Sequence, residues 1–175
     1  MRAAFLITGI SASGKSTVAQ ALAERLPRAA HVRGDVFRRM VVSGGAAMTP
    51  EPSRDAVRQL HLRYRIAAAA ADLYFEEGFA PIVQDVVLGT DLTLFAEMIH
   101  SRPLMVVVLA PDAATVERRE KERAKTGYGT WTVAELDEAL RRDTPRVGLW
   151  LDTSAQTPAE TVDEILARAA EARVA

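Results

Sequence analysis

The chain has 175 residues and a mass of 19.0 kDa, a length that fits one compact domain. Hydrophobic residues make up 49% and charged residues 26%, which excludes a disordered or fibrous protein. Lys and Arg total 22 against 23 Asp and Glu, so the chain lacks the basic field that non-specific nucleic-acid binding needs. We therefore expect no nucleic-acid partner.

Cysteine usage and hydropathy exclude further classes. The sequence has no cysteine, which rules out disulfides and thiolate metal sites, and its three histidines lack a metal-binding spacing. No apolar stretch reaches the roughly 20 residues of a membrane-spanning helix, and the N-terminal residues have no signal-peptide pattern. We expect a cytoplasmic protein without a membrane partner, acting as a monomer or a homodimer.

Predicted strands and helices alternate along the chain. Apolar runs typical of buried parallel strands lie at residues 3–8, 81–87 and 104–109, with shorter candidates at 30–33 and 147–151. Helical spacing of apolar residues predicts helices over 15–26, from 50–53 to 78, over 112–125, and after the capping sequences that begin at Thr132 and Thr157. This alternation predicts one α/β domain in which helices cover both faces of a parallel sheet.

Residues 9–16, GISASGKS, match the phosphate-binding pattern G-x-x-x-x-G-K-[ST] at every fixed position. Gly9 and Gly14 allow the backbone to turn amide hydrogens inward, beside the N-terminus of a helix. Lys15 adds a cation for the outer phosphates, and Ser16 can place its hydroxyl on Mg²⁺. We therefore predict ATP and Mg²⁺ as cofactors; the alternative is a serine-rich turn that caps a helix. The predicted binding residues are Gly9, Ser11, Ala12, Ser13, Gly14, Lys15, Ser16 and Thr17.

An acid and an arginine follow the second predicted strand, in the sequence GDVFR at 34–38. Strand ends of a parallel sheet gather on one edge, beside the phosphate loop. There Asp35 can accept the proton of an acceptor hydroxyl, and Arg38 can hold the substrate or the transferred phosphoryl group. The alternatives are a helix N-cap for Asp35 and a solvated helix position for Arg38.

Asp85 lies in the apolar run PIVQDVVLG, where an acid is costly unless it is paired or bound to a metal. Its position suits the end of the third strand. We assign it to Mg²⁺ coordination through water, with a buried, hydrogen-bonded structural acid as the alternative.

Residues 118–129 combine basic side chains with a glycine-containing turn, as a closing lid needs. Such a lid can deliver an arginine to the transferring phosphoryl group and exclude water, and Arg119 and Arg123 are the candidates. Glutamates are interleaved with these arginines, so an exposed helix with paired charges is the alternative.

These motifs resemble the small P-loop kinases, most closely the chloramphenicol phosphotransferase-like proteins. The resemblance rests on GISASGKS, RGDVF, IVQDVVLG, the arginine-rich lid, and LWLDTS before the closing helix. It implies a single three-layer P-loop kinase domain over residues 1–175, with a five-stranded parallel sheet in the order 2-3-1-4-5 and Asp35 matching the catalytic base. It also implies transfer of the ATP γ-phosphate to a hydroxyl of a small molecule, with antibiotics among the candidate acceptors.

Two alternatives remain open. The segment from Asp35 to Arg38 is also similar to zeta-type toxins, which phosphorylate a nucleotide sugar, and to shikimate- and gluconate-kinase-like enzymes. The short chain counts against the toxin, and VLG at 87–89 lacks the paired glycines of shikimate kinases. A different class is a non-catalytic ATP-binding switch, which would need Lys15 but not Asp35.

Overall fold

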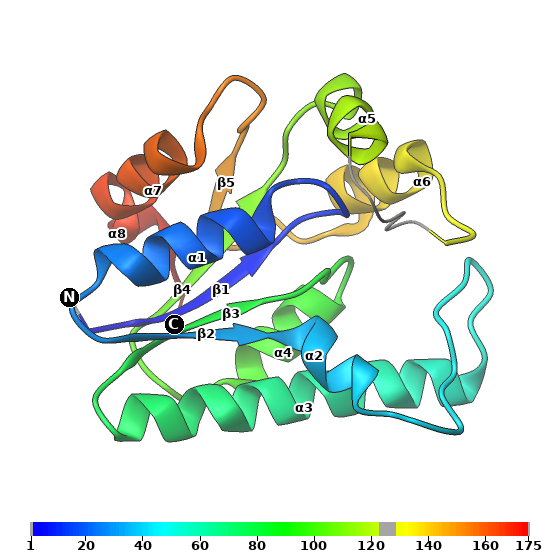
Figure 1. The fold of residues 1–175 in the computed structure, drawn as a ribbon, viewed down its shortest axis with the longest axis horizontal. Helices are drawn as coiled ribbons and strands as arrows, with labels where there is room; N and C mark the ends of the chain where they lie inside the picture. The colour runs from blue at the N-terminus through cyan, green and yellow to red at the C-terminus, as the bar shows by residue number, and fades with distance from the viewer. Residues whose placement is uncertain (1, 123–128, 175) are drawn as a thin grey trace.

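The computed structural model describes residues 2–122 and 129–174 (Figure 1). The strands are β1 (Ala4–Thr8), β2 (Ala29–Arg33), β3 (Ala80–Gln84), β4 (Leu104–Leu109), β5 (Leu149–Leu151) and β6 (Arg173–Val174). The helices are α1 (Lys15–Arg25), α2 (Gly34–Arg39), α3 (Arg54–Glu76), α4 (Asp91–Met98), α5 (Ala113–Lys121), α6 (Val133–Glu138), the π-helical turn η1 (Ala139–Asp143), α7 (Pro158–Ala167) and α8 (Ala169–Ala172). Within the described ranges, the expected alternation of strands and helices is confirmed.

The sheet has the order β2-β3-β1-β4-β5, and each neighbouring pair on this path is parallel. The expected order is therefore confirmed. A short sixth strand, β6, pairs antiparallel with the start of β4 and was not predicted, because two residues carry no strand pattern.

Helices cover both faces of this sheet, as expected (Figure 1). Side chains of β1 alternate between the faces, so Phe5 and Ile7 pack with α1, α7 and α8, whereas Leu6 packs with α3 and α4. These three side chains are fully buried. Burial of each contributes about 1.5–3 kcal/mol relative to exposure, which fixes the sheet between the two helical layers.

Side-chain caps set the helix starts that the sequence indicated. Ser53 accepts a hydrogen bond from the Ala56 amide at the start of α3. Thr132 and Thr157 each form a complete capping box, at α6 and α7. Such caps contribute about 1 kcal/mol each to stability. The helix starts that the sequence predicted at these three capping residues are confirmed.

Several local predictions differ from the structure. The last strand begins at Leu149 rather than at residue 147, and α5 ends at Lys121, before residue 125. Two further differences have identifiable causes. The third strand ends at Gln84 rather than at residue 87, because the Val87 amide and carbonyl both bond to the Thr8 hydroxyl, at 2.9 Å each, instead of continuing the ladder. Helix α4 was not predicted, since its N-cap residue Thr90 makes no side-chain cap. Tertiary contacts, not local pattern, decide both.

Candidate active site

The loop between β1 and α1 has the backbone that a phosphate site needs. Gly9 has φ +150°, and a Cβ there would lie 2.5 Å from the Leu109 carbonyl oxygen. Gly14 has φ +96° at the N-cap of α1 and brings no side chain to cover the first turn of the helix. The first-turn amides of α1 therefore point into the loop, where an anion is stabilised by them and by the helix dipole.

A pocket of about 350 Å³ opens onto this loop. Its lining residues are Ser11, Ala12, Gly14, Lys15, Ser16, Thr17, Arg119 and Glu122. The other two predicted binding residues, Gly9 and Ser13, are buried behind the loop and shape it from within. The structure therefore brings the predicted nucleotide-binding residues together around one pocket.

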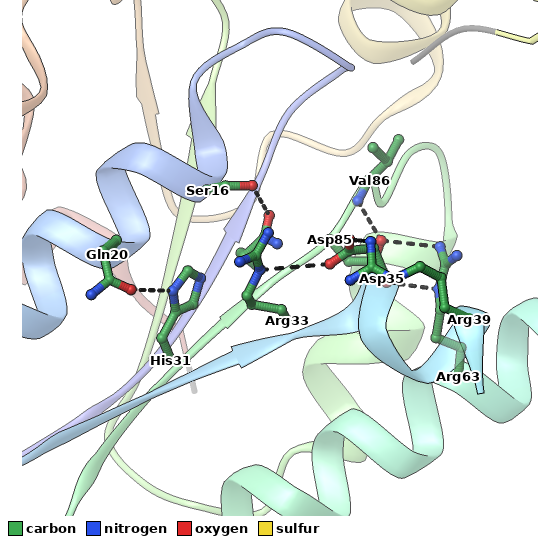
Figure 2. Close-up of polar contacts among 10 residues, drawn as sticks. Ser16, Gln20, His31, Arg33, Asp35, Arg39, Arg63, Asp85 and Val86 are labelled. Carbon is green, nitrogen blue, oxygen red and sulfur yellow. Dashed lines mark hydrogen bonds and ion pairs between the residues drawn. The ribbon is translucent and has the colours of Figure 1, made fainter. Parts of the chain in front are cut away.

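Two side chains of the loop have specific partners. Lys15 is 8% exposed, and its Nζ donates to the Ile10 carbonyl at 2.8 Å. The Ser16 hydroxyl donates to Gln84 Oε1 at 3.3 Å (Figure 2). Gln84 was missed by sequence analysis, although strand alternation could have found it: Ile82 packs on the α1 face, so Gln84 shares that face and Asp85 points to the other.

Asp85 is held on the opposite face by Arg63 of α3. Asp85 Oδ2 lies 2.8 Å from Arg63 Nε, and Oδ1 accepts from an Arg63 terminal nitrogen at 3.0 Å. The Val86 amide also donates to Oδ1, at 2.8 Å. Asp85 is therefore a buried, paired acid, as the alternative interpretation held; its assignment to Mg²⁺ through water stays a prediction. Arg63 was not foreseen, because its sequence position gives no sign of this pairing.

The electrostatics of Asp85 follow from this burial. Burial raises the pKa of Asp85, and the guanidinium of Arg63, the Val86 amide and the Lys15 ammonium oppose that rise. The nearby Asp35 carboxylate adds to it. The pKa of Asp85 thus depends on the charges of both Lys15 in the nucleotide pocket and Asp35 in α2.

Asp35 lies in the first turn of α2, where its side chain is 36% exposed. It pairs with Arg39 at 2.8 Å and, more distantly, with Arg33 at 3.8 Å (Figure 2). The N-cap of α2 is Arg33, so the N-cap interpretation of Asp35 is wrong. Arg38 is exposed, and Arg39 rather than Arg38 contacts Asp35. The substrate-binding role of Arg38 stays a prediction.

Arg119 of the predicted lid reaches the phosphate loop. Its terminal nitrogens donate to the Ser13 carbonyl at 3.3 Å and to the Thr153 carbonyl at 3.1 Å. Arg119 thus joins the phosphate loop to the segment after β5 and lines the nucleotide pocket. Arg123, the second lid candidate, lies outside the described residues, as does half of the predicted lid, residues 123–128.

A second, more open groove of about 510 Å³ lies between α1 and β2. It is lined by Ser16, Thr17, Gln20, Ala21, Glu24, His31 and Arg33. It shares Ser16 and Thr17 with the nucleotide pocket, so the two hollows meet at the start of α1. Burial, and after it the charge of Arg33, lowers the pKa of His31 in this groove.

The described residues contain neither a cluster of metal-binding side chains nor a membrane-spanning helix. No group of three or more His, Asp or Glu side chains in that part could hold a metal ion. Mg²⁺ would instead be held by the Ser16 hydroxyl together with nucleotide phosphates, which suits an ion that keeps few protein ligands. Among the described helices, none is long and apolar enough to cross a membrane.

Comparison with known proteins agrees with this geometry. A family model described as an AAA domain, AAA_33, matches residues 5–145. A UPF0200 protein of Aeropyrum pernix is 33% identical over 136 residues, which cover 76% of this chain and 71% of that protein.

Two solved structures share the fold. A sugar kinase from Janibacter superposes with a TM-score of 0.71 at 19% identity, over 98% of this chain and 96% of its own. The tunicamycin resistance protein of Deinococcus radiodurans gives 0.69 at 16% identity, over 99% of both chains. At these identities the likeness shows the fold alone.

The sheet order and the phosphate loop define a nucleotide-binding fold of the P-loop kinase class, with kinases among its structural neighbours. Since the matched model spans most of the chain, the protein belongs to the AAA_33 family of AAA domains.

Proposed function

We propose that this protein is an ATP-dependent phosphotransferase that moves the γ-phosphate to a hydroxyl of a small molecule. The observation that supports it is the juxtaposition of a complete phosphate-loop pocket with Asp35, at the carboxyl end of β2 on the same edge of the sheet. A binding module needs only the first of these. A kinase needs both a nucleotide site and a nearby acceptor of the hydroxyl proton.

On the nucleotide side, the amides of the loop and the first turn of α1 bind phosphate oxygens, and Lys15 neutralises the outer phosphates. The hydrogen of Ser16 points to Gln84, which leaves the hydroxyl oxygen free to face a cation. Bound there, Mg²⁺ would neutralise charge on the outer phosphates. Arg119 holds the loop against the segment after β5 and is available to the phosphates from the pocket wall.

On the acceptor side, Asp35 receives the proton of the attacking hydroxyl. The acceptor oxygen forms its bond to the γ-phosphorus while the bond from that phosphorus to the bridging oxygen breaks, and ADP leaves. Asp35 Oδ1 makes no hydrogen bond to any described residue, so a lone pair remains for this proton. Because this transition state is loose, positioning and charge stabilisation contribute more than the base itself.

The proposal also covers the chemical class of the acceptor. The names of the two structural neighbours, a sugar kinase and a tunicamycin resistance protein, support a hydroxylated small molecule and keep antibiotics among the candidates.

The test is a screen of hydroxylated metabolites and antibiotics for acceptor-stimulated ADP release, with Asp35→Asn and Lys15→Ala measured in parallel. The proposal expects at least one acceptor whose phosphorylated product appears with the wild type and is lost with both variants. ATP binding without stimulation by any acceptor would favour the non-catalytic switch instead.

A further inference from the structure

A series of contacts through other residues connects Arg63 of α3 to the proposed base, Asp35. We infer that Arg63 is a positioning residue: through Asp85 and Gly34 it fixes the place of Asp35. The catalytic part of this inference rests on the proposed function, whereas its structural part does not.

The first step is the pair between Arg63 and Asp85. Two nitrogens of the guanidinium meet both carboxylate oxygens, at 2.8 and 3.0 Å, and the two side chains are 15% and 6% exposed. Only the contact between the terminal nitrogen and Oδ1 is a hydrogen bond; the contact between Nε and Oδ2 is an ion pair without hydrogen-bond geometry. Two contacts between the same two buried groups still restrict their relative orientation more than one contact would. This pair therefore holds the residue that follows β3 against the middle of α3.

A second hydrogen bond connects α3 to the segment that follows β3. The Tyr64 hydroxyl, next to Arg63 in α3, donates to the Val86 carbonyl at 3.3 Å. The Tyr64 ring stacks on Phe95 of α4, with centroids 4.5 Å apart. A buried, stacked side chain therefore holds the backbone next to Asp85, and the Asp85 carboxylate itself is held by Arg63.

The next step is the contact between Asp85 and Gly34. A Cβ on Gly34 would lie 2.0 Å from Asp85 Oδ2 and 2.6 Å from its carboxyl carbon. The backbone of Gly34 is thus pressed against the fixed carboxylate, and only a residue without a side chain permits this approach. Asp35 is the following residue, so its Cα position is set by this contact.

The other partners of Asp35 cannot do the same. Arg39 belongs to α2 itself and so moves together with Asp35, whereas Arg33, the last residue of β2, lies 3.8 Å from the Asp35 carboxylate. Both are also about half exposed, and exposed ion pairs contribute little. The Asp85 contact thus holds the start of α2 against the residue that follows β3, in addition to the covalent connection of α2 to β2.

A buried ion pair is a costly way to gain stability, because apolar residues of the same volume usually serve equally well. Its distinctive property is a fixed geometry. The pair between Arg63 and Asp85 is therefore expected to affect turnover through the location of Asp35, without affecting the phosphate loop.

Two variants test the inference, one at Arg63 and one at Gly34. Arg63→Lys keeps the charge but leaves only one nitrogen to contact Asp85, and Gly34→Ala keeps Arg63 but places a methyl group against the Asp85 carboxylate. Their matched controls are Arg65→Lys, at an exposed position of the same helix, and Gly45→Ala, whose Cβ would meet its nearest atom at an ordinary 3.7 Å. Backbone amide resonances are recorded for each ¹⁵N-labelled protein, with the affinity for Mg²⁺ and a non-hydrolysable ATP analogue.

In both test variants we expect the Asp35 and Arg39 resonances to move, those of Gly14 to Thr17 to stay, and the analogue to bind with wild-type affinity. With an acceptor in hand, kcat falls about 100-fold, the magnitude typical of a displacement near 1 Å. KM for ATP is unchanged, and the acidic limb of the pH profile of kcat shifts, which a purely structural role would not produce. The controls behave as the wild type.

Unmoved Asp35 resonances in Gly34→Ala, or in a folded Arg63→Lys, would overturn the inference. If Arg63→Lys does not fold, Gly34→Ala decides it. Should the resonances move as expected while the wild type phosphorylates no acceptor, the positioning holds and the proposed function fails.

Discussion

The two halves of the site are built in different ways. The nucleotide half comes mainly from consecutive residues, 9–17, completed by Arg119 and Glu122, and it relies on backbone amides whose orientation is set by Gly9 and Gly14. The acceptor half is assembled from Asp35, Arg63 and Asp85, which come from three separate elements. The first is a local motif, and the second exists only in the folded chain.

Their physical chemistry differs accordingly. Amide dipoles carry no proton that titrates, so the nucleotide half keeps its character across pH. The acceptor half contains two carboxylates close enough for Asp35 to raise the pKa of Asp85. Changes to the two halves should therefore separate into effects on nucleotide binding and effects on transfer.

The largest effect is expected for Lys15→Ala, which removes the cation of the nucleotide half. We expect ATP binding to weaken severely and turnover to fall about 1,000-fold, the upper range for losing one preorganised donor. Calorimetric titration and ADP release check it. Lys121→Ala, an exposed lysine of α5, should change neither quantity.

Asp35→Asn should break the acceptor half alone. The amide cannot take the hydroxyl proton, so kcat should fall about 100-fold, at the lower range for a general base. The affinity for ATP should match the wild type. Asp163→Asn, which removes an exposed carboxylate of α7, is the control. Wild-type transfer by Asp35→Asn with every accepted substrate would remove Asp35 as the base.

Arg119→Ala tests whether Arg119 belongs to the nucleotide half of the site. The variant loses the bonds to the Ser13 and Thr153 carbonyls, so we expect Kd for ATP to rise about tenfold. Arg118→Ala, at an exposed neighbouring position, should leave Kd unchanged. If Arg119→Ala lowers kcat without changing Kd for ATP, Arg119 acts in phosphoryl transfer and its assignment to the nucleotide half is wrong.

The smallest effect on either half is expected from Asp72→Asn, far along α3. Burial works against ionisation of Asp72, but bonds from the Ser101 hydroxyl and the His100 and Ser101 amides outweigh it and hold the pKa below 3.8. A lowered folded pKa stabilises the protein above the unfolded pKa, and this contribution is lost as pH falls through the folded value.

Urea unfolding across pH measures this effect. The variant should lose about 2 kcal/mol at neutral pH, and its difference from the wild type should shrink toward acid. Kd for ATP and kcat should stay unchanged. A gap that does not shrink toward acid would contradict the assigned pKa direction.

The strand, loop and helix around residues 9–17 could be predicted from the sequence, because a phosphate-loop pattern places glycines, a lysine and a hydroxyl at fixed spacing; that the loop binds a nucleotide stays a prediction. The sequence also predicted the sheet order through resemblance. The neighbours of Asp35 were harder to foresee, since Arg38 and Arg39 differ by one helical position and only the folded α2 shows which faces the acid.

The pairing of Asp85 was equally hidden. Its burial was foreseen from the apolar run, but Arg63 lies 22 residues away among several arginines of α3. No local pattern distinguishes it from its exposed neighbour Arg65. Gln84 was accessible in principle, because the alternation of β3 places it on the face of Ser16.

The central claim is that the loop at residues 9–17 binds a magnesium-complexed nucleotide beside Asp35. Titration of ¹⁵N-labelled protein with Mg²⁺ and a non-hydrolysable ATP analogue tests it most directly. The account predicts saturable shifts of the Gly14, Lys15 and Ser16 amides, with the same affinity in Asp35→Asn. Unchanged loop resonances at saturating nucleotide would contradict it.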